Sequence, residues 1–503
     1  MSMRTLRIEL KKDHPAAAYF AKNAAASRAV RNRANFLIRN AMTGLHKSPE
    51  ERTSNETEAL HDIFTGIQKA NSKRIANGKA PFAYPTAGKW FLGYPVLDAI
   101  LKETGDPAYG SAVSHVAQQA IKKTVGAWKS YFAARSSYKR GPGKFEAPPR
   151  LPGYVKESYV TAHFTNQVCR LSEDDGRLYL HFARYGKVAI GPKGLLPGKY
   201  IKTDVRPYYG GWLLLVTYDD GVELPSVPAR PKRALGLDIG LENFLAGASN
   251  TGDTPFLIKG GWIKAQNQWF NKRRAQLLSS LAGGKDSRHS RKTSPSLERL
   301  SRQRGRMLRE FFYKCAHSVA RWCVAHGIEV IVIGHNRNPK QGIRLRRKTN
   351  QNFVSIPYGR FIQVLRTVAA KYGIPVIEQE ESYTSKASSL DNDQIPRYGE
   401  TGCVAIFSGK RVKRGLYRSA DGTLLNADIN AAANILRKAY PDIFADKDLS
   451  YLAGPVAVVT GEELLGIHPK EKKKKKPGKS PAAALRHRQR KQDRFSYLLL
   501  FSA

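Results

Sequence analysis

The chain has 503 residues and carries 84 Lys and Arg against 41 Asp and Glu, a formal net charge of +43. With 41% hydrophobic and 25% charged residues, it has the composition of a globular protein, which excludes a collagen-like, wholly disordered or disulfide-rich chain. Four cysteines, none at C-x-x-C spacing, indicate a reducing compartment, and no apolar run approaches the ~20 residues that span a bilayer. We expect a soluble, intracellular protein without a signal peptide or a membrane partner.

A basic C-terminal segment explains only part of the charge. Residues 470–494 carry 12 Lys and Arg against two acidic residues, which leaves +33 on the rest of the chain. Because Lys and Arg that neutralise phosphates release counterions, this excess predicts a polyanionic partner, with charge kept for solubility as the alternative. Residues 469–503 are low in complexity and are predicted to form a basic disordered tail.

In the first 230 residues the pattern of apolar and polar positions changes twice, from strand-like to helical and back to strand-like. Residues 2–10 alternate like a strand, and an Ala-rich segment, 14–45, has the apolar spacing of a helix. Helical patterns continue to a Pro- and Gly-rich boundary at 139–153, and short alternating strands fill 154–218. The pattern predicts a β unit with a helical insertion after its first strand.

A second domain opens after a Pro-rich linker with the apolar strand RALGLDIG, residues 233–240. Two long basic helices follow, at 262–282 and 294–326, and the stretch from Lys264 to Arg309 holds 13 Lys and Arg against two acids. Further on the chain alternates a strand, a helix, a second strand, a hairpin and a closing helix, at 328–334, 358–373, 374–380, about 419–422 and 426–441. Alternation of this kind after the hairpin-like stretch ENFLAGASNTGDTPFLI, residues 242–258, predicts an RNase H-like α/β layer.

Three carboxylates stand at strand or helix ends. Asp238 ends a buried strand, Glu381 follows the strand IPVIEQE, and Asp428 lies in the first turn of the closing helix. Carboxylates gathered from such ends bind hard divalent cations, and two Mg²⁺ or Mn²⁺ ions can activate water for phosphodiester cleavage. The alternatives are a strand end for Asp238, a helix-dipole carboxylate for Asp428 and, with Glu378 and Glu380, a solvated strand end for Glu381.

Several basic or aromatic residues are candidates for nucleic-acid contact. The basic helix pair is the best phosphate-binding candidate, and Tyr383, Thr384 and Ser385 either orient Glu381 or contact the DNA backbone. Aromatic residues among the basic ones, such as Trp262, stack on bases or belong to the core. The nucleic-acid-binding candidates are Arg28, Arg31, Lys272, Arg273, Arg274, Arg302, Arg306, Arg344, Arg346, Arg347, Tyr383, Lys386, Lys410 and Arg411; the further aromatic candidates are Trp269 and Phe270.

The motifs RALGLDIGLENFLA, ESYTSKASSLDND and NADINAAANI, together with the basic helix pair, resemble the TnpB family of RNA-guided nucleases encoded by bacterial insertion sequences. The resemblance is strongest over about 231–440. It implies an α/β multidomain fold, a wedge β-barrel (1–14 and 145–230) with an inserted helical recognition lobe (15–144), and an RNase H-like RuvC nuclease domain (231–468). Asp238 matches the first RuvC aspartate and Asp428 the last.

Two departures from the family pattern concern the site. The family glutamate belongs at the end of the strand 328–334, where this chain has Gly334, His335 and Asn336. It resembles a subgroup in which Glu381 takes that place. This requires strand IPVIEQE to lie beside RALGLD, with Glu378 and Glu380 on the opposite face from Glu381.

The second departure is the absence of the family's paired cysteines after YTS. Cys403 is isolated, so we expect a ribbon-like loop at about 386–410 without zinc. His335 is either a replacement ligand or a hydrogen-bonded loop histidine.

The resemblance implies an RNA-guided, divalent-metal-dependent DNA endonuclease that binds a guide RNA and double-stranded target DNA and cuts beside a short adjacent motif. It further implies a cytoplasmic, nucleoid-associated protein that is monomeric in its complex. The alternatives are a guide-directed DNA-binding protein without cleavage, a transposition accessory, and a guide-independent nuclease.

Overall fold

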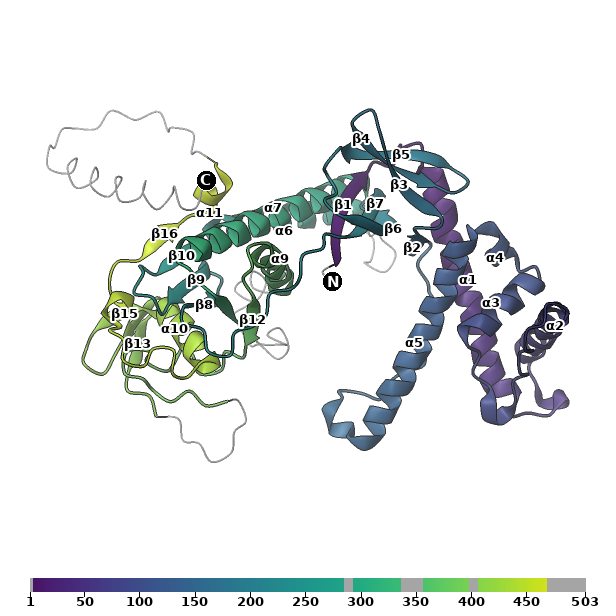
Figure 1. Ribbon diagram of the computed structural model, residues 1–503, viewed down its shortest axis with the longest axis horizontal. Helices are drawn as coiled ribbons and strands as arrows, with labels where there is room; N and C mark the ends of the chain where they lie inside the picture. The colour runs from purple at the N-terminus through teal and green to yellow at the C-terminus, as the bar shows by residue number, and fades with distance from the viewer. Residues whose placement is uncertain (1–2, 285–292, 336–355, 398–405, 468–503) are drawn as a thin grey trace. The chain divides into compact units, whose positions relative to one another are not determined.

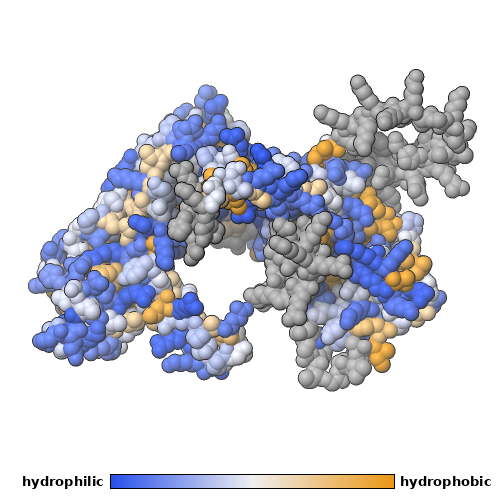
Figure 2. Space-filling model, turned by 180° about the vertical axis from the view of Figure 1, so that it is seen from behind, coloured by the Kyte–Doolittle hydropathy of each residue, from blue (hydrophilic) through white to orange (hydrophobic). Residues whose placement is uncertain are grey.

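The computed structural model describes residues 3–284, 293–335, 356–397 and 406–467 (Figure 1). The chain divides into two compact units, Met1–Gly221 and Val222–Ala503. Hydrophilic side chains cover much of the face drawn in Figure 2, as the charge predicts. The candidates Arg344, Arg346 and Arg347, together with Cys403 and the basic tail, lie outside the described residues.

The first unit contains two antiparallel sheets, ordered β1-β7-β6-β2 and β3-β4-β5. Strand β1 pairs along its whole length with β7, from Met3 opposite Asp219 to Leu10 opposite Trp212. The first strand of the chain is therefore completed by a strand about 200 residues later, and the helices lie between them in sequence. The strands are β1 Met3–Leu10, β2 Ala162–Thr165, β3 Cys169–Asp174, β4 Arg177–Phe182, β5 Gly186–Pro192, β6 Lys199–Tyr208 and β7 Gly211–Asp219.

The helices of the first unit pack around a core that continues into its sheets. Trp128 is fully buried and donates from Nε1 to Oδ1 of Asn35 at 2.9 Å, which ties α5 to α1. Small residues of the Ala-rich α1 allow this close packing. The helices are α1 Ala17–Gly44, α2 Ser54–Ala76, α3 Tyr94–Glu103, α4 Pro107–Ser111 and α5 Ser114–Arg140, with 3₁₀ turns η1 Pro49–Glu51, η2 Ala87–Lys89 and η3 Pro142–Lys144.

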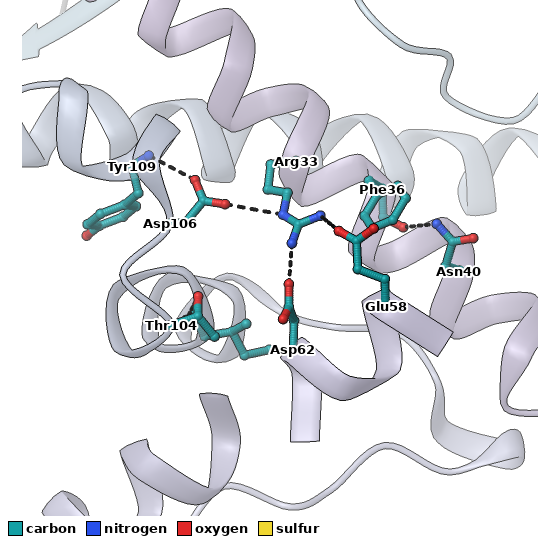
Figure 3. Close-up of polar contacts among 9 residues, drawn as sticks. Arg33, Phe36, Asn40, Glu58, Asp62, Thr104, Asp106 and Tyr109 are labelled. Carbon is teal, nitrogen blue, oxygen red and sulfur yellow. Dashed lines mark hydrogen bonds and ion pairs between the residues drawn. The ribbon is translucent and has the colours of Figure 1, made fainter. Parts of the chain in front are cut away.

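One arginine of α1 joins three helical segments (Figure 3). Arg33 donates from Nε to Asp106 at 3.2 Å and from a terminal nitrogen to Glu58 at 2.9 Å, and it also pairs with Asp62. Glu58 and Asp62 belong to α2, and Asp106 caps α4. The charge of Arg33 is thus neutralised within the helical region.

The second unit is built on a six-stranded mixed sheet in the order β12-β11-β8-β9-β10-β16. Strands β8, β11 and β12 are parallel, whereas β9 is antiparallel to both neighbours. The strand IPVIEQE contains β12, so the expectation that it lies beside RALGLD is wrong, because β11 runs between them. The strands are β8 Ala234–Ile239, β9 Asn243–Ser249, β10 Phe256–Lys259, β11 Val330–Gly334, β12 Val376–Gln379 and β16 Ala457–Val459.

Two hydrophobic clusters cover the two faces of this sheet. Alternate residues of β8, such as Leu235 and Leu237, pack with α7 and α9, whereas Ala234 packs with α10 on the opposite face. A second, three-stranded sheet of this unit, β13-β14-β15, precedes α10. The remaining elements are α6 Gly261–Ala282, α7 Pro295–Ala325, α9 Tyr358–Lys371, β13 Lys410–Lys413, β14 Leu416–Arg418, β15 Leu424–Asn426, α10 Ala427–Ala439, η4 Ser450–Leu452 and α11 Gly461–Leu465.

Candidate active site

Close packing of α10 on β8 brings Asp428 towards Asp238. A Cβ added at Gly236 would collide with the carbonyl oxygen of Ala432, so only glycine admits the helix this closely. Asn426 caps α10, its side chain accepting from the backbone N–H of Asp428 at 2.9 Å. The helix cap is therefore Asn426, and the carboxylate of Asp428 is available for other contacts.

Glu381 reaches the end of β11, the strand that lies between β8 and β12. A Cβ added at Gly334 would lie 3.1 Å from Oε2 of Glu381 and 2.5 Å from Cδ1 of Ile435. The carboxylate thus occupies space beside the position where the family pattern expects its glutamate. Glu381 follows β12, and β11 lies between β12 and β8, so its side chain must pass over the end of β11 to approach Asp238. Gly334 stands at that end, and because it has no side chain it leaves room for the carboxylate.

The alternation expected for the neighbouring glutamates does not continue past the strand. Glu378 lies in β12 and contacts Nδ1 of His335 at 2.8 Å and Arg366 of α9 at 2.9 Å. Glu380 instead accepts from Lys438 of α10 at 2.6 Å. The prediction that they share a face is wrong, because β12 ends at Gln379 and the pleat ends with it.

The charges of Asp428 and Glu381 act on Asp238. Asp238 keeps some access to solvent at the end of β8, but burial raises its pKa, and the charges of Asp428 and Glu381 raise it further, to about 8, while Arg411 lowers it. Burial also raises the pKa of Glu381, an effect that His335 partly offsets. A site of this kind favours a proton or a cation.

Asn243 orients Asp428 and is itself held by Lys259. Its Oδ2 accepts from Nδ2 of Asn243 at 2.6 Å, and Oδ1 of Asn243 accepts from Lys259 at 2.8 Å. Asn243 is buried at the start of β9, and the sequence analysis missed it. The available signal was its place five residues after Asp238, within the quoted motif RALGLDIGLENFLA.

A cleft of about 680 Å³ opens beside Asp428 and is bordered by positive side chains. Lys259, Arg411 and Arg414 line it, and a terminal nitrogen of Arg411 lies 3.5 Å from Oδ1 of Asp428. Basic side chains next to a carboxylate are suited to holding phosphates there. Of these, only Arg411 was a sequence candidate.

The donor chemistry fits Mg²⁺ or Mn²⁺, because Asp238, Glu381 and Asp428 offer hard oxygen atoms. Within the described ranges, however, no group of three or more His, Cys, Asp or Glu side chains is arranged to hold a metal ion. His335 is hydrogen-bonded to Glu378, which agrees with its interpretation as a loop histidine. The three carboxylates are therefore neighbours whose roles as ligands stay a prediction.

Other nucleic-acid candidates differ in exposure. Arg28 and Arg31 are half-buried in α1, and burial lowers the pKa of Arg31. Tyr383 adopts a left-handed backbone conformation with φ +66°, and the ammonium of Lys386 lies 5.8 Å from the centre of its ring. Arg302 is half-buried. The exposed candidates are Lys272, Arg273, Arg274, Arg306, Lys386, Lys410 and Arg411.

Thr384 and the segment after it are fixed by buried polar contacts. The hydroxyl of Thr384 donates to the carbonyl oxygen of Glu381 at 2.8 Å, which supports the orienting interpretation of the YTS motif. Asn434 of α10 donates to the carbonyl oxygen of Thr384 at 3.0 Å, and Arg437 donates to that of Asp393 at 2.8 Å. Hydrogen bonds from α10 thus hold the described part of the ribbon-like segment.

Two family models match this chain. A family described as a probable transposase, OrfB_IS605, matches residues 216–339. A family described as Cas12f1-like, TNB domain, matches residues 358–435. The two matches together include Asp238, Glu381 and Asp428.

A curated relative is the TnpB-like protein ORF457 of Acidianus two-tailed virus, 26% identical over 221 residues. The match covers 42% of this chain and 43% of that relative, so the chain spans less than half of its length.

Similar solved structures include a Cas12f1–sgRNA–target DNA complex (14% identity, 86% of this chain and 99% of that chain, TM-score 0.29). A second is Alicyclobacillus acidoterrestris C2c1 in complex with single-guide RNA (10% identity, 84% of this chain and 70% of that chain, TM-score 0.29). Among the described helices, none combines the length and apolar character needed to cross a membrane.

Proposed function

Since this chain is a member of the TnpB family, we propose that it is an RNA-guided DNA endonuclease whose site contains Asp238, Glu381 and Asp428. It binds a guide RNA and double-stranded DNA through phosphate contacts, and base pairing supplies the sequence. The exposed basic residues of α6, α7 and β13 support this part of the proposal. Within the first unit, Arg28 and Arg31 are the candidate contacts.

The observation that carries the proposal is the carboxylate of Glu381 beside Gly334. Asp238 lies at the end of β8 and Asp428 in the first turn of α10. In this proposal Glu381 is the third acid of the site, at the ends of the parallel strands. When bound there, divalent cations would activate water and offset the charge of the leaving oxygen. Asn243 holds the carboxylate of Asp428, and Arg411 and Lys259 bind and orient the phosphate backbone in the cleft.

The test is a swap of the glutamate between its two positions. Glu381→Gln keeps the size of the side chain but removes its charge, so guided cleavage should fall by orders of magnitude while DNA binding persists. A glutamate restored at Gly334 needs space that Cδ1 of Ile435 occupies, so the rescue variant combines Glu381→Gln, Gly334→Glu and Ile435→Val. Partial recovery of cleavage is the expected result.

Ile435→Val alone is the control and should cut normally. If Glu381→Gln cuts normally but Glu380→Gln does not, the assignment is displaced by one residue. If both variants cut normally, neither glutamate belongs to the nuclease site. If the unsubstituted chain binds target DNA with its guide but does not cut it, the chain is a guide-directed DNA-binding protein instead. RNA that co-purifies with the chain would identify the guide, and its absence would favour a guide-independent nuclease.

A further inference from the structure

The aromatic residues of α6 separate into core and surface positions. Trp262 is 9% exposed and stacks on Phe311 of α7, with ring centres 5.6 Å apart. Phe270 lies under the guanidinium of Arg304, 4.8 Å from its ring centre. Trp269, in contrast, is 47% exposed. Packing therefore accounts for Trp262 and Phe270 but leaves nearly half of the Trp269 surface in solvent.

Trp262 and Trp269 are seven residues apart and so lie on one stripe of the helix. The stripe is covered at Trp262, where a Cβ added at Gly461 of α11 would lie 2.6 Å from the Cβ of the tryptophan. Helix α11 ends at Leu465. Trp269 thus continues this stripe at a position where the side chain is exposed.

A shallow hollow of about 360 Å³ lies against Trp269. Ala265 and Gln266 of α6 line it, together with Gln303 of α7. An indole face stacks on any nucleobase, and glutamine amides can donate to and accept from base edges. This combination is suited to a single unpaired base.

The surroundings are suited to the strand that carries such a base. Helix α6 contains no acidic residue, and Lys272, Arg273 and Arg274 are all exposed one turn beyond Trp269. The helix begins at Gly261, which lines the cleft beside Asp428. At a rise of 1.5 Å per residue, Trp269 lies about 12 Å along the helix from Gly261.

We propose that Trp269 stacks an unpaired base of the DNA strand that runs between this hollow and the cleft beside Asp428. Lys272 and Arg273 bind the phosphates of the same strand. The identity of the strand rests on the proposed function, whereas the stacking itself requires no cleavage. Binding can therefore be measured separately from nuclease activity.

The experiment uses the full chain with Asp238→Ala, so that the probe stays intact, and a fluorescent 20-nucleotide oligo-dT. Trp269→Ala should weaken binding about tenfold, and Trp269→Phe should restore most of it. The matched control is Tyr313→Ala on α7, a tyrosine that is 41% exposed. This control should bind normally.

A second oligonucleotide, of the same length but with abasic sites, keeps the phosphates and removes the bases. With this probe the loss caused by Trp269→Ala should disappear, whereas the loss caused by Lys272→Ala should persist. An equal loss on both probes, or no loss on either, overturns the proposal. Binding of oligo-rU that depends on Trp269 while binding of oligo-dT does not would overturn the assignment to DNA.

If Trp269→Ala weakens oligo-dT binding but Asp238 proves dispensable for cleavage, the stacking stands and the proposed nuclease site fails. Thermal unfolding of each variant identifies any loss that comes from the fold. A melting temperature lowered in Trp269→Ala and restored in Trp269→Phe, with abasic binding also lost, would make the residue structural and overturn the proposal.

Discussion

Two clusters of three carboxylates, one in each unit of the chain, have opposite charge arrangements. In the first unit Glu58, Asp62 and Asp106 surround the guanidinium of Arg33, which contacts all three (Figure 3). In the second unit two further carboxylates, Asp428 and Glu381, raise the pKa of Asp238, and the charge of Arg411 partly offsets this rise. The first arrangement contains its own cation, whereas the second raises the pKa of Asp238 to about 8.

This difference separates a structural cluster from a candidate chemical one. Arg33 joins α1, α2 and the cap of α4, so its carboxylates stabilise the arrangement of the helices. The carboxylates at and around Asp238 come from the ends of β8 and α10 and from the chain beyond β12. At the proposed metal site, a bound cation would compensate the repulsion that Asp238 experiences. The following predictions test whether the two clusters differ in this way.

The largest expected effect is on cleavage. Asp238→Asn and Asp428→Asn should each lower the rate of guided cleavage by about three orders of magnitude or more, because a metal ligand is lost. Arg33→Met should leave the rate within about twofold when assayed well below its melting temperature. Single-turnover cleavage with saturating guide RNA measures all three, and guide binding is the control for folding.

A pH dependence should follow from the raised pKa of Asp238. Since the unfolded carboxyl has a pKa of about 3.9 and the folded one of about 8, the metal-free fold binds the extra proton between these values. Its stability should therefore fall as pH rises from about 4 to 8. A divalent cation bound at the proposed site would displace this proton, so its affinity should rise by up to about tenfold per pH unit until about pH 8 and then level off.

Thermal unfolding with and without Mn²⁺, at intervals from pH 6 to pH 9, measures both effects. Asp238→Asn removes the titrating group and is the control, which should show little pH dependence in this window. A pH-independent Mn²⁺ affinity in the unsubstituted chain would contradict the assignment of the shared proton to this cluster.

Removal of the central cation should destabilise the first cluster. Arg33→Met leaves three neighbouring carboxylates without their common partner, at a cost of about 2 kcal/mol for this half-buried site. Urea unfolding followed by circular dichroism measures the change. Lys187→Met, which breaks the exposed pair with Asp174 in the same unit, should leave the urea midpoint almost unchanged, because solvent screens an exposed ion pair.

A comparable cost for the two substitutions would show that Arg33 is only another surface ion pair. The cluster around Arg33 would then not stabilise the arrangement of the helices.

Much of the second unit could be predicted from local patterns. The buried strand that ends at Asp238, the Ala-rich closing helix and the two basic helices are each specified by residues adjacent in sequence. The order of the strands could not be predicted this way, since no local pattern states that β11 runs between β8 and β12. The choice of Glu381 over Glu380 nevertheless agrees with the contact at Gly334, because that glycine marks the missing side chain.

The supporting residues of the site were harder to predict. Asn243 and Asp428 are 185 residues apart, and their hydrogen bond depends on the packing of α10 against the sheet. The basic residues of α1 illustrate the same limit. Arg33 lies in the same Ala-rich segment as the candidates Arg28 and Arg31, and only the fold reveals the three acids around it.

The smallest expected effect concerns the position of Glu381 rather than its charge. Lys438 is 4% exposed and donates to Glu380 at 2.6 Å and to the carbonyl oxygen of Ser382 at 2.9 Å, so it fixes the residues on both sides of Glu381. Lys438→Met should raise the Mg²⁺ concentration needed for half-maximal cleavage about tenfold, while the rate at saturating Mg²⁺ stays within about threefold. Arg366→Met is the matched control, because Arg366 contacts Glu378 from α9 and should leave the Mg²⁺ requirement unchanged. A loss of rate that added Mg²⁺ does not restore would mean that Lys438 supports the fold and not the placement of the carboxylate, since misplacement alone weakens the cation's binding without removing a ligand.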